Sequence, residues 1–220
     1  MRYSHFLIAA FMGFIVVGCT TVGIHDRAAR EQFRFAEEMR TVRLCVYLDN
    51  GITVQQVQAL LADAWDADAE GIGIRWEIAD TRPWPRSGFT YMSLREDVDR
   101  LPLLPHCDRA MLFLGRHFGD VLWGLAAVIL PLPEVGGYVD DEVHLRGYVV
   151  ATRATLLQVI WLTPASTLRH ELYHMLGCDH GSDLGPCYRV IHSLKAASRG
   201  QKFFAARVGW SGEVIIAMRP

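Results

Sequence analysis

The stretch VRLCVYLDNGITVQQVQALLADAWDADAEGIGIRWEIAD, residues 42–80, decides the fold class. Residues 42–49 are rich in β-branched and aromatic side chains and alternate in polarity, a pattern typical of a strand. Residues 53–69 repeat apolar side chains at helical spacing, and Thr53 is a suitable N-cap residue for that helix. Residues 72–80 are again alternating and β-rich. The stretch therefore predicts a strand, an amphipathic helix and a second strand.

The remainder of the chain continues this alternation. Gly71 is expected to end the first helix, and two prolines and a glycine indicate a loop over 81–88. A short helix is expected around 92–100, and further strands over 109–115 and 144–152. Strands that alternate with helices favour parallel pairing through right-handed crossovers. We therefore expect an α/β (α+β) fold around a mixed twisted sheet.

The amino-terminal residues have the features of an export signal. Residues 6–17, FLIAAFMGFIVV, are an apolar run that is too short for a transmembrane helix, which needs about 20 residues. The run has the length of a signal-peptide core, and Gly18-Cys19 follows it. This ending resembles the lipobox of bacterial lipoproteins, in which the cysteine is lipidated. The alternative is an ordinary secretory signal with a chance cysteine.

On the lipoprotein interpretation, residues 1–18 are a signal peptide and Cys19 is the lipidation site. Residues 19–41 then form a lipidated tether with an N-terminal helix over 26–40. The expected location is the cell envelope, with the lipid anchor in a membrane. Because Thr20 is not aspartate, the resemblance implies the periplasmic face of the outer membrane if the organism is Gram-negative.

The composition excludes several function classes. Hydrophobic residues make up 51% of the chain and charged residues 21%, which is typical of a globular protein rather than a disordered one. The chain length allows one sizeable domain or at most two small ones. The formal net charge is −2, and the sequence has no basic block, so we expect no nucleic-acid partner. We expect a monomer.

Four cysteines besides Cys19 are candidates for disulfides: Cys45, Cys107, Cys178 and Cys187. Four cysteines allow three pairings. An oxidising compartment makes disulfides the default, whereas the alternative is four buried free thiols. The favoured local pair is Cys178 with Cys187, which leaves Cys45 with Cys107.

The stretch HELYHMLGCDH, residues 170–180, lies on a second predicted amphipathic helix. Thr163-Pro164 is a strong helix start, and Gly177 is expected to provide a left-handed C-terminal cap. His170 and His174 lie one turn apart on this helix. The apolar residues that share a nearly opposite face, at about 100° per residue, are Leu168, Leu172, Met175 and Leu176.

This spacing suits a catalytic zinc ion. Two imidazoles at positions i and i+4 can ligate one tetrahedral ion through their ring nitrogens. Glu171 is offset by one residue, which suits a general base rather than a ligand. Gly177 allows a sharp turn, so His180 can supply a third ligand and leave the fourth position open. The expected cofactor is therefore Zn2+, held by His170, His174 and His180. The alternative is a set of solvated polar side chains.

The pattern His-Glu-x-x-His-x-x-Gly-x-x-His resembles the signature of the metzincin zinc metallopeptidases. The resemblance implies a zincin-like fold with a backing helix, an active-site helix over about 164–176 and a small C-terminal subdomain over 178–220. It also implies a single metallopeptidase domain over 42–220. An antiparallel edge strand, which pairs with extended substrate in that family, would lie within 121–139. Only the motif is a specific match.

Two features depart from the metzincin pattern. Metzincins carry a methionine-containing turn beneath the zinc, usually followed by a helix. The Met-turn candidate here is Met218, the only methionine after the motif, and it lies almost at the C-terminus. A helix is instead expected before it, over about 188–206. The alternative is that Met218 is merely a core residue. The short N-terminal segment leaves no room for a folded pro-domain.

Two function hypotheses follow from these residues. The first is a zinc-dependent endopeptidase that acts on peptide or protein substrates, with Glu171 as general base. The alternative is a non-catalytic envelope lipoprotein whose zinc site is structural and which acts as a binding or assembly module. A third-ligand role for Glu213 has little support, because Glu213 lies on an apparent strand. Surface or hydrogen-bonded roles rather than ligand roles are expected for His106, His117, His144 and His192. Structural roles rather than oxyanion stabilisation are expected for Tyr138 and Tyr188, and His180 rather than the adjacent Asp179 is the expected ligand.

Overall fold

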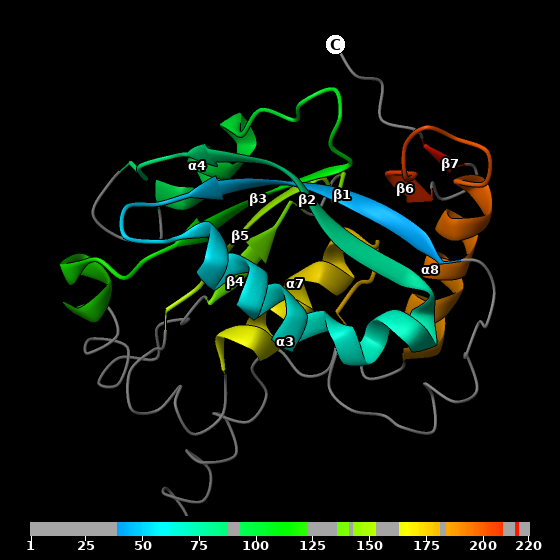
Figure 1. The fold of residues 1–220 in the computed structure, drawn as a ribbon, viewed down its shortest axis with the longest axis horizontal. Coiled ribbons are helices and arrows are strands. Elements are labelled where there is room, and N and C mark those ends of the chain that lie inside the picture. Colours follow the sequence, from blue (N-terminus) through cyan, green and yellow to red (C-terminus); the bar gives the residue numbers. More distant parts are fainter. Residues whose placement is uncertain are drawn as a thin grey trace, which may run out of the picture.

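The computed structural model describes seven segments of the chain: residues 39–87, 93–122, 136–140, 143–152, 163–180, 184–208 and 214–215. They form a five-stranded sheet with helices packed on both faces and a two-stranded ribbon at one end (Figure 1). The mixed α/β architecture expected from the sequence is confirmed. None of the helices in these segments is long and apolar enough to span a membrane.

The central sheet has the strand order β2-β1-β3-β5-β4. Its strands are β1 (Arg40–Leu48), β2 (Ile74–Pro83), β3 (Arg109–Leu114), β4 (Gly137–Val139) and β5 (Arg146–Val150). All neighbouring strands pair in parallel except β4, which pairs antiparallel with β5 and forms an outer edge. The short ribbon pairs β6 (Arg207–Val208) with β7 (Val214–Ile215).

Four of the helices in the described residues lie around the sheet: α3 (Val54–Ile72), α4 (Leu94–Arg100), α7 (Pro164–Met175) and α8 (Leu184–Ala197). In Figure 1, α3 and α7 lie against one face of the sheet, α4 lies against the other face, and α8 stands at the end that carries β6 and β7. The two faces bury separate cores, because side chains alternate across each strand.

Helix α3 begins as expected and ends later than expected. Thr53 and Gln56 form a reciprocal capping box at the N-terminus. Gly71 does not end the helix, which continues to Ile72, because Gly73 takes the left-handed conformation (φ 67°) that closes it. The predicted end at Gly71 was therefore wrong by two residues.

Three other boundaries differ from the predictions. Strand β2 starts later than residue 72. It extends to Pro83, because residues 81–83, which were expected to begin a loop, still pair with β1. Strand β5 is shorter than 144–152. Helix α8 spans 184–197 rather than 188–206, and Ser198 Oγ, which donates to Leu194 O, accepts from Ala205 N at 2.8 Å. That contact folds the chain back against the helix end.

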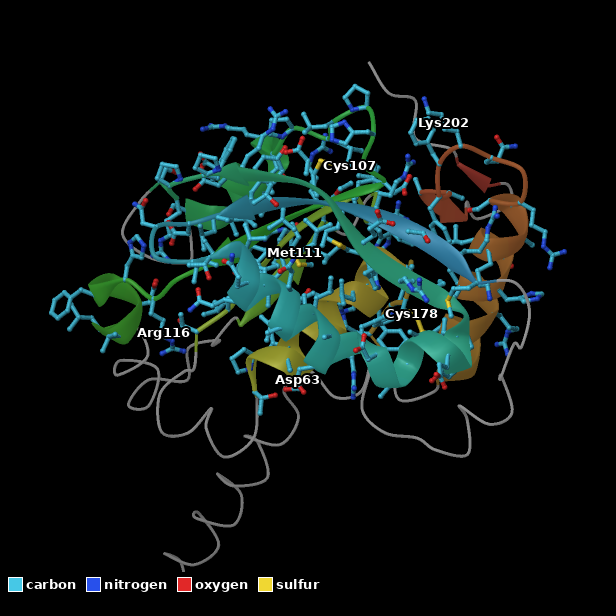
Figure 2. The ribbon with its side chains drawn as sticks, viewed as in Figure 1. Asp63, Cys107, Met111, Arg116, Cys178 and Lys202 are labelled. Atoms are coloured by element: carbon cyan, nitrogen blue, oxygen red, sulfur yellow. A yellow bond between two sulfur atoms is a disulfide. The ribbon has the colours of Figure 1, made fainter. Side chains whose placement is uncertain are left out.

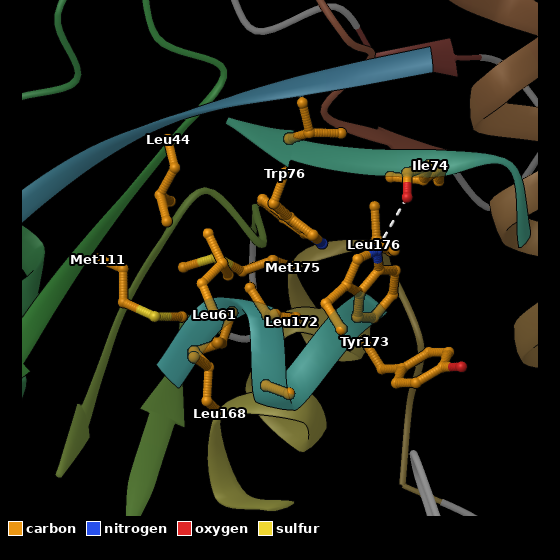
Figure 3. Close-up of a cluster of buried hydrophobic side chains, with 14 of the residues drawn as sticks. Leu44, Leu61, Ile74, Trp76, Met111, Leu168, Leu172, Tyr173, Met175 and Leu176 are labelled. Carbon is orange, nitrogen blue, oxygen red and sulfur yellow. Dashed lines mark hydrogen bonds between the residues drawn. The ribbon is translucent and has the colours of Figure 1, made fainter. Parts of the chain in front are cut away.

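The core between α3, α7 and the sheet positions the motif helix (Figure 3). The expected apolar face is confirmed, since three residues of α7 and the residue that caps it are fully buried: Leu168, Leu172, Met175 and Leu176. Trp65 of α3 packs beside them against Tyr173, and its Nε1 donates to Ile74 O at 2.8 Å. Helix α7 therefore packs against both α3 and the sheet.

Two disulfides join the expected partners, Cys45–Cys107 and Cys178–Cys187. They lie on opposite faces of the sheet, and Figure 2 labels one cysteine of each. The first ties β1 to the segment before β3. The second ties the turn after α7 to α8. The proposed signal peptide, Cys19 and Met218 lie outside the described residues, as does nearly all of the helix predicted over 26–40, whose last residue, Arg40, begins β1.

Candidate metal centre

Helix α7 has well-defined ends that fix the motif in space. Thr163 Oγ1 accepts a hydrogen bond from Ser166 N at 3.1 Å, which confirms the predicted N-cap. At the other end, Gly177 has φ 81°. Gly177 N donates to His174 O and Cys178 N donates to Tyr173 O, the bond pattern of a Schellman cap. The turn toward His180 is therefore a closed, hydrogen-bonded structure.

The three predicted histidine ligands converge. One ring nitrogen from each of His170, His174 and His180 lies within 4.8 Å of the other two. The Nε2 atoms of His170 and His174 are 3.0 Å apart. His174 is buried, His170 is partly exposed and His180 is exposed, so the cluster opens to solvent on one side. This group could hold a metal ion.

The tautomer of His174 follows from its neighbour. Nδ1 of His174 lies 2.6 Å from the carbonyl oxygen of Cys178. A carbonyl oxygen only accepts hydrogen bonds, so Nδ1 carries the proton and Nε2 presents its lone pair toward His170. A carbonyl partner on the far nitrogen is the usual way in which proteins orient a metal-binding histidine.

The electrostatic environment also keeps His174 neutral. Burial, followed by the neighbouring His170, lowers the pKa of His174 from 6.5 to about 3. The hydrogen bond to the Cys178 carbonyl opposes this change without cancelling it, and His180 and His144 lower the pKa further. A metal ligand must be deprotonated, so His174 is in the ligand form across the neutral range.

Glu171 points from α7 to the edge strand β4. It is 4% exposed. A Cβ atom on Gly137 would lie 2.5 Å from Oε1 of Glu171 and 2.8 Å from its Cδ, which is closer than any real side chain tolerates. Gly136 similarly leaves room for Thr167. The glycine pair at the start of β4 thus makes space for the carboxylate between the helix and the strand.

A second group of ligand-type side chains lies on the opposite face of the sheet. Atoms of Cys45, His106 and Cys107 also fall within 4.8 Å of one another. The two cysteines are joined at an S–S distance of 2.04 Å, so neither sulfur is a thiolate. His106 is exposed, and its Nε2 lies 3.1 Å from Asp80 Oδ2. With the disulfide closed, this group is not a metal site.

The remaining histidines and tyrosines of interest lie as follows. His117 Nε2 is 2.9 Å from Asp49 Oδ2, and Tyr138 carries Arg95 over its ring at 4.9 Å. Tyr188 is buried, and the centroid of its ring lies 6.5 Å from that of Tyr173. His144, which was expected to be a surface or hydrogen-bonded residue rather than a ligand, is 9% exposed and contributes to the low pKa of His174.

Sequence reasoning missed the part that Gly137 plays beside Glu171. The signal was present, because two consecutive glycines in a predicted edge strand indicate close approach of another group. Comparison with known proteins adds no relative: the chain matches no family model, and no curated protein is significantly similar to it. The functional interpretation therefore depends on the geometry described above.

Proposed function

We propose that this protein is a zinc-dependent endopeptidase of the metzincin type. The observation that carries the proposal is the convergence of three histidine ring nitrogens, two from α7 and one from the turn that follows it, on a helix that also carries the buried Glu171. Two nitrogens bound at about 2.0–2.1 Å to a tetrahedral ion are separated by roughly 3.3 Å. The 3.0 Å between the Nε2 atoms of His170 and His174 is close to that separation. The donor set therefore fits zinc.

In this proposal, His170, His174 and His180 would hold the ion, and the cluster is open to solvent on the side of the exposed His180. A bound zinc ion would polarise the scissile carbonyl and lower the pKa of a water molecule to about 7. Glu171 accepts the proton of the attacking water and delivers it to the leaving amine. Its position against Gly137 keeps the carboxylate at the strand edge, where an extended substrate would lie.

The edge strand β4 supports a peptide as the substrate. Among the described strands, β4 pairs only with β5, so its outer side presents main-chain donors and acceptors. An extended peptide can add to such an edge through main-chain hydrogen bonds. The scissile bond would then lie next to Glu171, because Gly137 belongs to both the edge strand and the contact with that carboxylate.

We also propose that Cys19 is lipidated and anchors the domain in the cell envelope. The support is the apolar run followed by Gly18-Cys19 in the sequence. Mass spectrometry of the protein recovered from a bacterial envelope would test this proposal. A diacylated N-terminal Cys19 is expected, and a mature chain cleaved elsewhere without lipid would contradict it.

The endopeptidase proposal is tested with Glu171→Gln. We expect the variant to retain one zinc ion per chain and to hydrolyse an unstructured protein such as casein roughly 10²–10⁴-fold more slowly, the usual contribution of a general base. Hydrolysis by the variant at the wild-type rate would refute the role of Glu171 as general base. A wild-type protein that binds zinc but cleaves no member of a peptide library would favour a structural zinc site in a binding or assembly module.

A further inference from the structure

Arg109 is a buried arginine that contacts the C-terminal end of the motif helix, α7. It is the first residue of β3, whose other residues are apolar, and its exposure is 0%. Its guanidinium donates three hydrogen bonds of 2.7–2.9 Å to main-chain carbonyls: Nε to Met175 O, Nη1 to Asp108 O and Nη2 to Ala205 O. Burying a charged group is costly unless it is well bonded, so such a side chain calls for an explanation.

The bond to Met175 completes the C-terminus of α7. The last carbonyls of a helix have no partners within the helix. The Schellman cap supplies donors for Tyr173 O and His174 O, and Arg109 Nε supplies one for Met175 O at 2.9 Å. A cation at this end also complements the helix dipole. Arg109 thus acts on the residue that directly follows the ligand His174.

The same guanidinium fixes the segment that follows α8. Arg109 Nη2 donates to Ala205 O and Ala206 O, at 2.7 and 3.3 Å. The neighbouring Asp108 accepts from Phe204 N at 3.0 Å, and the Phe204 ring lies 5.7 Å from the guanidinium carbon. The residues Phe204–Ala206, which we call the floor segment, are therefore bonded to the start of β3.

We propose that Arg109 is a positioning residue of the metal centre, which clamps the end of α7 to the floor segment and thereby fixes the turn that leads from His174 to His180. This inference rests on the proposed zinc site. The turn is short, and its geometry depends on the Met175 and Cys178 carbonyls, which are held by Arg109 and by His174. Release of Met175 would let the turn and the exposed His180 move relative to His174.

The proposal explains why arginine occupies this position. A lysine has a single ammonium group and cannot reach Met175, Asp108 and Ala205 at once, whereas the planar guanidinium bonds all three in a fixed arrangement. An apolar residue would suit the pattern of β3 but would leave the Met175 carbonyl without this donor. Arg109→Lys should therefore retain part of these hydrogen bonds, and Arg109→Met should lose all of them.

The test compares zinc affinity in the full chain, by competition with a chelator, for the wild type, Arg109→Lys and Arg109→Met. The control is Arg86→Met, because the Arg86 side chain is also fully buried and pairs with Asp120 at the opposite end of the parallel strands. The visible absorption spectrum of the cobalt-substituted proteins reports ligand geometry independently of hydrolysis. Thermal unfolding of the metal-free proteins reports general destabilisation.

We expect a 10–100-fold loss of zinc affinity and an altered cobalt spectrum in Arg109→Met, the range typical of residues that orient metal ligands. Arg109→Lys should lose less, and Arg86→Met should bind zinc as the wild type does even though it unfolds at a lower temperature. Wild-type affinity and spectrum in both Arg109 variants would overturn the inference but leave the proposed zinc site intact. A wild type that binds zinc without hydrolysing peptides would overturn only the endopeptidase proposal, and one that binds no metal would overturn both.

Discussion

Two clusters in this protein place three metal-ligand side chains within the same 4.8 Å, yet only one of them can serve as a metal site. In one, Cys45 and Cys107 are bonded to each other and only the exposed His106 is left. In the other, the neighbouring disulfide joins Cys178 to Cys187 and involves none of the three convergent histidines, His170, His174 and His180. Proximity is therefore not sufficient, and the chemical state of the donors decides.

The two clusters also differ in the groups that surround their histidine nitrogens. His174 has its far nitrogen held by the Cys178 carbonyl and its pKa lowered to about 3, so its lone pair is oriented and unprotonated. His106 instead lies at the surface, where its Nε2 is 3.1 Å from Oδ2 of the partly exposed Asp80. A ligand site is recognised by what orients its donors, as much as by the donors themselves.

The largest expected effect is on zinc affinity, when one histidine is removed from each cluster in turn. His174→Ala removes the buried central ligand and should lower zinc affinity at least about 10³-fold, because two ligands remain where three are needed. His106→Ala, the matched change in the cysteine cluster, should leave the affinity unchanged. Chelator competition measures both. A comparable loss in the two variants would mean that the clusters had been assigned the wrong way round.

The disulfides should show opposite rankings for stability and for metal affinity. In the chain-entropy account, Cys45–Cys107, with a sequence separation of 62, contributes about 4 kcal/mol, and Cys178–Cys187, with a separation of 9, about 3 kcal/mol. Paired Cys→Ser variants, unfolded in urea without metal, should follow that order. Zinc affinity should fall only without Cys178–Cys187, which restrains the turn that carries His180. Equal zinc affinities in the two variants would argue against this restraint.

A smaller effect is expected at the edge strand. Gly137→Ala places a methyl group against Glu171 and should lower peptide hydrolysis about 10²-fold while zinc content stays at one per chain, because the histidines are untouched. Gly71→Ala is the control, since a Cβ there meets nothing within 4 Å on α3. Steady-state rates and elemental analysis decide the outcome. Normal hydrolysis by Gly137→Ala would show that the carboxylate is free to relocate.

The smallest effect is a pH dependence of the metal-free protein. In the unfolded chain His174 takes up a proton near pH 6.5, whereas in the folded protein it does so only near pH 3. The free energy of unfolding therefore decreases as the pH falls from the first value to the second. From pH 7 to pH 5 this amounts to about 2 kcal/mol. Urea unfolding with chelator present should show the decline in the wild type and a correspondingly weaker one in His174→Gln. Parallel pH profiles would contradict the low pKa.

The sequence predicted what depends on local patterns. Alternation located β1, helical spacing located α3 and α7, and residue chemistry gave the caps at Thr53 and Thr163, because each signal lies within a few neighbouring residues. Spacing also predicted that His170 and His174 share a helix face. The local cysteine spacing favoured Cys178–Cys187, and this choice left Cys45–Cys107 as the remaining pair.

The sequence did not predict what depends on distant partners. The end of β2 at Pro83 follows from pairing with β1, and the end of α8 at Ala197 follows from Ser198 bonding to Ala205. The contact of Gly137 with Glu171 arises only when α7 meets the sheet edge. Arg109 had a visible signal, a charged residue at the head of an apolar strand, but its partners lie 66 and 96 residues away.

Zinc K-edge X-ray absorption of the full chain, with both disulfides closed and zinc added at one equivalent, tests the central claim most directly. The account predicts one tightly bound zinc ion with three imidazole nitrogens at about 2.0–2.1 Å and no sulfur neighbour. The same spectrum should be lost in His174→Ala. A sulfur shell at about 2.3 Å, or a wild-type protein that retains no zinc, would contradict the assignment of the metal centre to His170, His174 and His180.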